Sequence, residues 1–171
     1  NATGAWAGVV AGLAGATVDI IYSKGSLIVT HNRITDRVVN RLRPSASADI
    51  LVPGGTVSIL GTTSIRVDDL DQIYPTVEEV DDMVGEAVKM IPALETVRYI
   101  RAYAGVRPLV GSRSASDDRG VSRSFALIDH SADGLENFTT ISGGKLTTYR
   151  LMAEKTADLV CHRLGVSRPC K

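Results

Sequence analysis

The 171-residue sequence predicts an α+β fold, in which amphipathic helices cover an antiparallel sheet. Short segments rich in β-branched residues recur over residues 18–62, and Gly, Pro, Ser or Asn residues separate them. A helix-capping motif and an apolar stripe at helical spacing follow. Because 44% of the residues are hydrophobic, the chain can bury a substantial core.

The N-terminal part should begin with a short helix and continue as a sheet. Residues 5–14 are mostly small and apolar, which suits a short helix. Four segments then have the composition of strands: Val18–Ser23, Ser26–His31, Arg37–Leu42 and Val57–Thr62. We expect them to pair as an antiparallel sheet.

A single helix is predicted over residues 76–91. Thr76 and Glu79 have the spacing of a capping box, in which each side chain accepts a hydrogen bond from the other residue's backbone amide. Apolar residues recur every three or four positions from Val80 to Ile91 and form one face. Such a face packs in a core far more often than it binds a partner, so we expect it to lie on the sheet.

The C-terminal part should contain three strands and a final helix. The strands are predicted at residues 97–103, 124–129 and 138–141. Residues 111–120 are polar and rich in Gly and Ser, which predicts a surface loop. The final helix should end before Gly165. Its buried face is predicted to consist of Ala153, Ala157, Val160, Cys161 and Leu164.

Charge and cysteine content argue against several classes of function. Nineteen basic and nineteen acidic residues cancel, so no overall field attracts the chain to nucleic acid, and we expect no such partner. No apolar run reaches the roughly 18 residues of a membrane span. Cys161 and Cys170 suit structural thiols in a reducing compartment better than a disulfide. No metal-ligating cluster is evident, so no metal site is predicted.

The junction from Ile141 to Arg150 has the composition of an anion-binding turn. Gly143 and Gly144 let the backbone turn tightly and approach a ligand, while Lys145 and the first helical amides add positive potential. The spacing matches neither a Walker loop nor the dinucleotide-binding fingerprint. Considered alone, the junction is more typical of a simple strand-to-helix turn with a solvated lysine.

Six segments strengthen the case for a ligand site: Asn1–Trp6, Lys24–Ser26, Gly61–Ser64, Ala104–Leu109, Val121–Arg123 and Gly143–Arg150. In order and approximate spacing they resemble the FAD-dependent glycerol-3-phosphate dehydrogenases, specifically the large catalytic subunit of the anaerobic type. Leu164–Cys170 resembles that subunit just before its C-terminal iron–sulfur extension. Because no G-x-G-x-x-G turn is present, we expect this chain to be the C-terminal portion, without the N-terminal dinucleotide-binding unit.

The resemblance implies a flavoprotein fold of the D-amino-acid-oxidase-like type. Residues 1–16 and 104–171 would belong to the FAD-binding domain, which would end in a C-terminal helix. Residues 17–103 would form the substrate-binding domain with its large mixed or antiparallel sheet. Since most contacts to FAD would lie outside this chain, the isolated fragment is expected to bind the cofactor poorly and to be inactive.

The resemblance also implies an activity, which is oxidation of sn-glycerol 3-phosphate to dihydroxyacetone phosphate by hydride transfer to FAD. Electrons would pass to the quinone pool through iron–sulfur and membrane-anchor subunits, which would hold the cytoplasmic enzyme peripherally at the inner face of the cell membrane. Arg107, Arg123 and Lys145 match family positions that bind the substrate phosphate, and Arg107 is the catalytic candidate, because it could stabilise a developing alkoxide. The implied FAD contacts are Thr3, Gly4, Gly143, Gly144, Lys145, Leu146 and Thr147.

Two alternatives remain open. The polypeptide could be a non-catalytic substrate-domain fragment or interaction module. It could also be a related FAD-dependent amine or hydroxy-acid oxidase, which would not need Arg107, Arg123 and Lys145 to converge on a phosphate. No general base is assigned, because Leu27 stands where the aerobic enzymes have a histidine.

Overall fold

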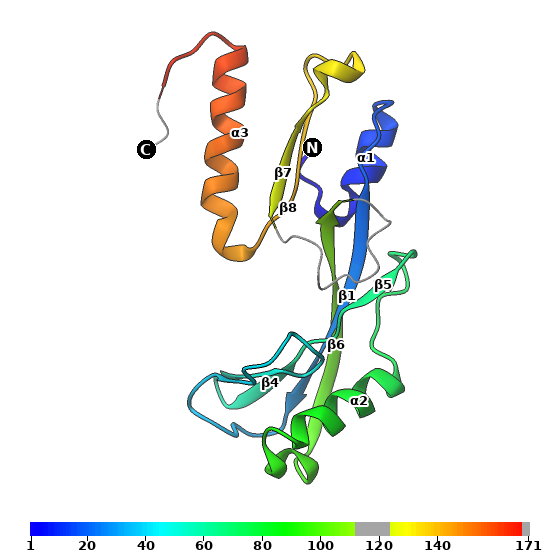
Figure 1. Cartoon of the computed structure of the whole chain (residues 1–171), viewed down its shortest axis with the longest axis vertical. Helices are drawn as coiled ribbons and strands as arrows, with labels where there is room; N and C mark the ends of the chain where they lie inside the picture. Colours follow the sequence, from blue (N-terminus) through cyan, green and yellow to red (C-terminus); the bar gives the residue numbers. More distant parts are fainter. Residues whose placement is uncertain (112–123, 169–171) are drawn as a thin grey trace. The chain divides into compact units, whose positions relative to one another are not determined.

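The computed structural model describes residues 1–111 and 124–168, and the chain divides into two compact units (Figure 1). Unit 1 comprises Asn1–Tyr22 and Arg107–Lys171, and unit 2 comprises Ser23–Val106. The predicted α+β class is confirmed, since each unit combines helices with antiparallel strands. The assignment of FAD-binding and substrate-binding domains, with boundaries at residues 16/17 and 103/104, stays a prediction.

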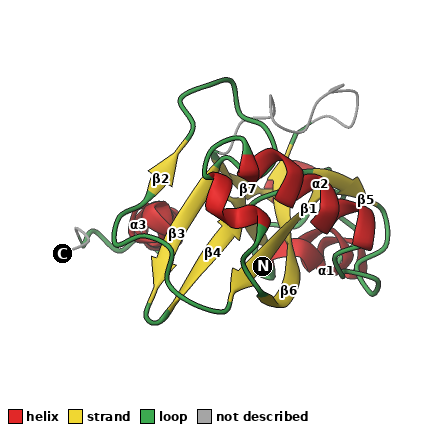
Figure 2. Cartoon of the chain, turned by 90° about the horizontal axis from the view of Figure 1, so that it is seen from below, coloured by secondary structure: helices red, strands yellow, loops and turns green. Residues whose placement is uncertain are grey.

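Most of unit 2 is built on a six-stranded sheet with the strand order β2-β3-β4-β1-β5, in which β6 also pairs with β1 (Figure 2). The first residues of β1 and the last residues of β6 are assigned to unit 1. The strands are β1 (Ile20–Thr30), β2 (Val39–Asn40), β3 (Ile50–Gly54), β4 (Val57–Gly61), β5 (Ile65–Val67) and β6 (Tyr99–Val110). β4 is central: it pairs antiparallel with β3 on one side and with β1 on the other, so that Leu60 lies opposite both Leu51 and Ile28.

Several predicted strand limits were wrong. The two strands expected at Val18–Ser23 and Ser26–His31 form the single strand β1. Gly25, which separates the two segments in the sequence, does not break the strand, because it is buried next to Lys24, which pairs with Glu79 inside the protein. β2 retains only Val39 and Asn40 of its predicted segment. β3 and β5 were missed, and β6 continues well beyond residue 103 to Val110.

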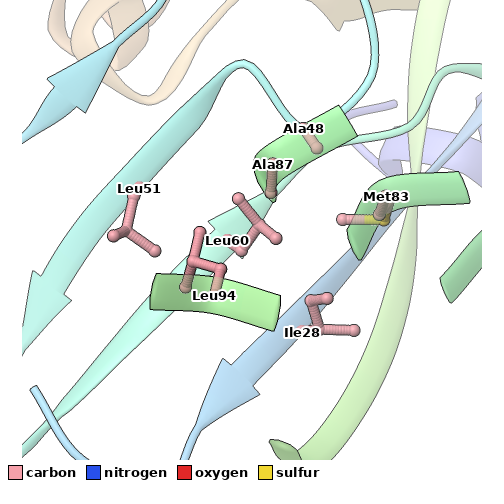
Figure 3. Packing of buried hydrophobic residues seen from close by; sticks show 7 residues of the cluster. All are labelled: Ile28, Ala48, Leu51, Leu60, Met83, Ala87 and Leu94. Atoms are coloured by element: carbon pink, nitrogen blue, oxygen red, sulfur yellow. The ribbon is translucent and has the colours of Figure 1, made fainter. Parts of the chain in front are cut away.

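Helix α2 (Val77–Val88) supplies the apolar cover of the unit 2 sheet. Its capping box is confirmed: Thr76 Oγ1 accepts from the Glu79 amide at 3.2 Å, and Glu79 Oε2 accepts from the Thr76 amide at 2.7 Å. The helix ends at Val88, and the 3₁₀ turn η2 (Pro92–Glu95) follows it. The buried core combines α2, η2 and the sheet, as predicted (Figure 3), and consists of Ile28, Ala48, Leu51, Leu60, Met83, Ala87 and Leu94.

The carboxylate of Glu86 on α2 should make unit 2 sensitive to acid. Hydrogen bonds from Lys89 and Arg43 lower the pKa of Glu86 from 4.5 to about 2. A lowered folded-state pKa stabilises the fold above the unfolded value, and this stability is lost as the pH falls from about 4.5 towards 2. We therefore expect Glu86→Gln to flatten the fall in melting temperature over this window, as measured by thermal unfolding at each pH. Asp81→Asn, at an exposed position of α2, is the matched control and should leave the slope unchanged.

Unit 1 combines a two-stranded sheet with two α-helices. Its elements are η1 (Gly4–Trp6), α1 (Ala7–Leu13), β7 (Phe125–Asp129), η3 (His130–Asp133), β8 (Thr139–Gly143), η4 (Leu146–Thr148) and α3 (Tyr149–Arg163). β7 and β8 pair antiparallel, with Leu127 opposite Ile141, which confirms the two predicted strands. The small buried core is Ala7, Ala11, Ala16, Val18 and Ile20.

The predicted buried face of the last helix was wrong. No residue of α3 is fully buried, and of the five predicted residues only Cys161 is even half-buried. α3 contacts β7, and its Met152 lies next to Gly144 at the start of the helix. Apolar spacing shows which residues share a face, but the position of the neighbouring strand decides which face is covered. Gly165 takes the predicted left-handed conformation after the helix, with φ of +65°. Across the described residues, no helix is long and apolar enough to cross a membrane.

Candidate functional site

The turn between β8 and α3 requires glycine at two successive positions. Gly143 and Gly144 have φ values of +80° and +78°, a left-handed conformation that disfavours other residues. A Cβ atom on Gly143 would lie 2.7 Å from the Ser124 carbonyl oxygen, and one on Gly144 would lie 2.6 Å from Met152 Sδ. The predicted tight turn is confirmed, and it packs closely against Ser124 and Met152. The approach of its backbone to a ligand stays a prediction.

Two backbone amides after this turn are available to a ligand. The amide of Gly144 donates to the Ser124 carbonyl at 3.3 Å, and that of Lys145 donates to Thr148 Oγ1 at 2.9 Å. The amides of Leu146 and Thr147 have no hydrogen-bond acceptor among the residues described. They begin the helical run that continues into the 15-residue helix α3. Such a helix start attracts an anion or an electron-rich edge.

The N-terminal segment that carries Thr3 and Gly4 is held against β8. The backbone nitrogen of Asn1 donates to the Thr139 carbonyl at 2.8 Å, and the Ile141 amide donates to the Asn1 carbonyl at 2.9 Å. β8 ends at Gly143, so the strand that leads into the glycine turn also anchors Asn1, two residues before Thr3.

The three basic residues predicted to bind phosphate have different settings. Lys145 is exposed on the turn. Arg107 is half-buried on β6, and Val110 of the same strand lies 3.5 Å from the position that a Gly143 Cβ would take. Arg123 lies outside the described residues. Their convergence on one phosphate stays a prediction.

Two polar features of this unit were missing from the predicted site. The Ser142 hydroxyl, on a side chain that is 3% exposed, has no partner in the part of the chain described, and it lies next to the glycine turn. Thr140, two residues earlier on the same face of β8, hydrogen bonds to the buried side chain of His130. The two-residue spacing of hydroxyl side chains just before the glycines was the available signal for both.

An ion pair holds the far end of α3 to β7. Arg163 donates to the carboxylate of Asp129, which also accepts a hydrogen bond from the Ser131 amide at 2.9 Å. The Ser131 amide, followed by the Arg163 guanidinium, lowers the pKa of Asp129 to about 2. This contact is structural and lies away from the glycine turn. Within residues 1–111 and 124–168, no group of three His, Cys, Asp or Glu side chains could hold a metal ion.

Comparison with known proteins gives a consistent result. The family model described as "DAO: FAD dependent oxidoreductase" matches residues 1–159. The chain is 48% identical over 173 residues to an anaerobic glycerol-3-phosphate dehydrogenase subunit of Escherichia coli K12, with coverage of 99% of this chain and 32% of that protein. Identity to an anaerobic glycerol-3-phosphate dehydrogenase subunit of Haloferax volcanii is 44%, with coverage of 100% of this chain and 30% of that protein. The chain thus spans about a third of the length of the curated relatives it matches.

Solved structures show the same similarity. The glycerol-3-phosphate dehydrogenase from Bacillus halodurans complexed with FAD matches with a TM-score of 0.73 and 26% identity, over 100% of this chain and 33% of that one. The L-proline dehydrogenase from P. horikoshii, at 20% identity and a TM-score of 0.67 over 98% of this chain and 43% of its own, shows the fold alone. Both the predicted D-amino-acid-oxidase-like fold and the resemblance to the anaerobic dehydrogenases are confirmed.

Proposed function

The chain belongs to the DAO family of FAD-dependent oxidoreductases, and we propose that it is part of a flavoprotein that oxidises sn-glycerol 3-phosphate to dihydroxyacetone phosphate. The observation that carries this proposal is the Gly143–Gly144 turn at the start of α3, in a chain whose similarity to the anaerobic dehydrogenases extends over nearly its whole length. The fold alone would fit an amine oxidase equally well, whereas the degree of sequence identity favours the dehydrogenase.

The residues of the turn fit a flavin. Gly143 and Gly144 hold the turn in a left-handed conformation. The Leu146 and Thr147 amides after the turn and the Ser142 hydroxyl before it are polar groups with no partner among the described residues. With Thr3 and Gly4, residues 143–147 would hold FAD, which supplies the hydride acceptor when bound. The two amides, reinforced by the α3 dipole, would stabilise negative charge on the cofactor edge that they face.

The basic side chains would bind the phosphate of the substrate. A dianionic phosphate is held best by guanidinium groups together with a supporting ammonium, which Arg107, Arg123 and Lys145 provide. Arg107 would also stabilise the negative charge that develops on the substrate oxygen when the hydroxyl proton leaves. Charge and hydrogen bonding at these side chains would therefore select a phosphorylated alcohol over glycerol itself.

The proposal extends to the destination of the electrons. We propose that the full-length protein passes them to the quinone pool through iron–sulfur and membrane-anchor subunits, at the inner face of the cell membrane. This part rests on the resemblance to the anaerobic enzymes, whose name describes one subunit of an assembly. Co-purification of the full-length protein with such subunits, and reduction of a quinone analogue by the membrane fraction, are the expected results.

Lys145→Ala tests the proposed phosphate site in the full-length protein. Charged hydrogen bonds contribute about 1.5–3 kcal/mol each, so kcat/KM for glycerol 3-phosphate should fall by roughly tenfold or more. Lys155→Ala, which removes an exposed lysine of α3 whose nearest carboxylate is 3.9 Å away, is the matched control and should leave kcat/KM unchanged.

Unphosphorylated glycerol separates two roles for Lys145. If the lysine contacts only phosphate, the weak activity on glycerol should hardly change. If it acts on the flavin, both activities should fall together. Undiminished activity of Lys145→Ala on both compounds would show that Lys145 is a solvated surface residue with no role in the site.

A further inference from the structure

A buried histidine connects the two backbone segments of the proposed flavin site. The side chain of His130 is fully buried. Its Nδ1 lies 2.8 Å from Asp133 Oδ2, and its Nε2 lies 2.9 Å from Thr140 Oγ1. Thr140 Oγ1 also accepts from Asn1 Nδ2 at 3.1 Å. The resulting chain of contacts runs from Asp133 through His130 and Thr140 to Asn1.

The chemistry of the four groups orders this network. A carboxylate accepts hydrogen bonds, so the tautomer of His130 that pairs with Asp133 carries its proton on Nδ1 and leaves Nε2 as an acceptor. The Thr140 hydroxyl therefore donates to His130 and uses its oxygen to accept from the amide group of Asn1. In this arrangement the Thr140 hydroxyl uses both its proton and its oxygen, one for each neighbour.

The network holds Asn1 by its side chain as well as by its backbone. Asn1 Nδ2 also donates to the Ala7 carbonyl at 2.9 Å, at the start of α1, and Asn1 Oδ1 accepts from the Thr3 hydroxyl at 2.8 Å. Asn1 is therefore the point at which the segment carrying Thr3 and Gly4 joins β8, three residues before the Gly143 turn.

We propose that His130 is a positioning residue, which acts through Thr140 and Asn1 to fix the Asn1–Gly4 segment relative to the Gly143–Gly144 turn. This inference rests on the proposed function, because it concerns the residues that would hold FAD. His130 does not contact the cofactor in this role. Its contribution is to preorganise two backbone segments that would both contact FAD.

Thr140→Val in the full-length protein tests the proposal with one nearly isosteric change. It removes the hydroxyl that joins His130 to Asn1. In the FAD-free protein, we expect hydrogen exchange of the Ile141 amide, which donates to Asn1, to become about tenfold faster. In the FAD-bound protein, we expect the Kd for FAD to rise about tenfold and the reduction potential of the bound flavin to shift.

Thr140→Ser should restore both the slow exchange and the FAD affinity, because it keeps the hydroxyl. Thr139→Val, the same substitution one residue earlier, is the matched control and should change neither, since the Thr139 side chain has no hydrogen bond among the described residues. His130→Phe should reproduce Thr140→Val while keeping a ring against Phe138, whose centroid lies 5.1 Å from that of His130. If His130→Phe does not fold, the Val and Ser variants of Thr140 still show whether the network positions the Asn1–Gly4 segment.

Two results would overturn the positioning role. One is unchanged exchange at Ile141 in Thr140→Val, which would mean that the network does not hold the segment. The other is faster exchange with unchanged FAD affinity and potential, which would make the network a local support of the fold. Failure of the proposed function is distinguishable, because it would appear in the wild-type protein as an absence of FAD binding or of glycerol-3-phosphate oxidation.

Discussion

Replacing Lys24 with methionine is expected to lower the free energy of unfolding of unit 2 by about 3–5 kcal/mol, because it leaves a buried carboxylate without its counter-charge. Lys24 Nζ lies 3.1 Å from Glu79 Oε2, and the two side chains are only 8% and 7% exposed. Lys24 also donates to the Tyr74 carbonyl at 3.0 Å. Glu79→Leu should cost a similar amount, since it leaves the ammonium with that carbonyl alone. Denaturant titration of the full-length protein, monitored by hydrogen exchange of the unit 2 amides, measures both changes.

The double variant Lys24→Met/Glu79→Leu separates the ion pair from its surroundings. A buried pair is often replaceable by apolar residues at little cost, so the double variant should recover part of the stability lost in either single variant. The hydrogen bonds that Glu79 accepts from the Thr76 amide and the Ser26 hydroxyl stay lost in it. Glu79 Oε1 is buried without a hydrogen-bond partner among the described residues, so the pair is not fully compensated even in the wild type. Glu78→Gln, at the exposed neighbouring position, is the control and should have a small effect. Single variants as stable as the wild type would show that the pair is solvated.

Gly143→Ala should destabilise unit 1 and weaken FAD binding together. A non-glycine residue at φ of +80° costs about 1–2 kcal/mol. The added Cβ would also lie 2.7 Å from the Ser124 carbonyl oxygen, and relief of such overpacking costs about 1–3 kcal/mol more. Because the obstruction is backbone, the turn itself must move, and the Leu146 and Thr147 amides with it. Thermal unfolding and FAD titration of the full-length protein measure the two effects.

Gly134→Ala is a matched control for the strain alone. Gly134 has φ of +83°, close to that of Gly143, but a Cβ there would have nothing within 4 Å. Gly134→Ala should therefore lower stability only by the cost of a non-glycine residue at positive φ, and it should leave the FAD affinity unchanged. If Gly143→Ala bound FAD as tightly as Gly134→Ala, the turn would not be part of the flavin site.

The sequence by itself determined the features that depend on residues close together in the chain. The capping box of Thr76 and Glu79 involves residues three apart, and the structure confirms both of its hydrogen bonds. The glycine pair at 143 and 144 was evident because few residues other than glycine tolerate such a turn. β7 and β8 were predicted from their own composition, and the family from short segments in a fixed order.

Only the tertiary structure decided the features that depend on partners far along the chain. Gly25 suggests a break between two strands, yet it lies within β1 beside Lys24, which can be buried there because Glu79 on α2 balances its charge. The face that α3 covers depends on where β7 runs, and apolar spacing cannot show this. The Asn1 side chain reaches Thr140, 139 residues away, and Thr140 in turn hydrogen bonds to His130. Pairing between polar groups that lie far apart in the chain depends on neighbours in space, so the sequence pattern around each residue does not reveal it.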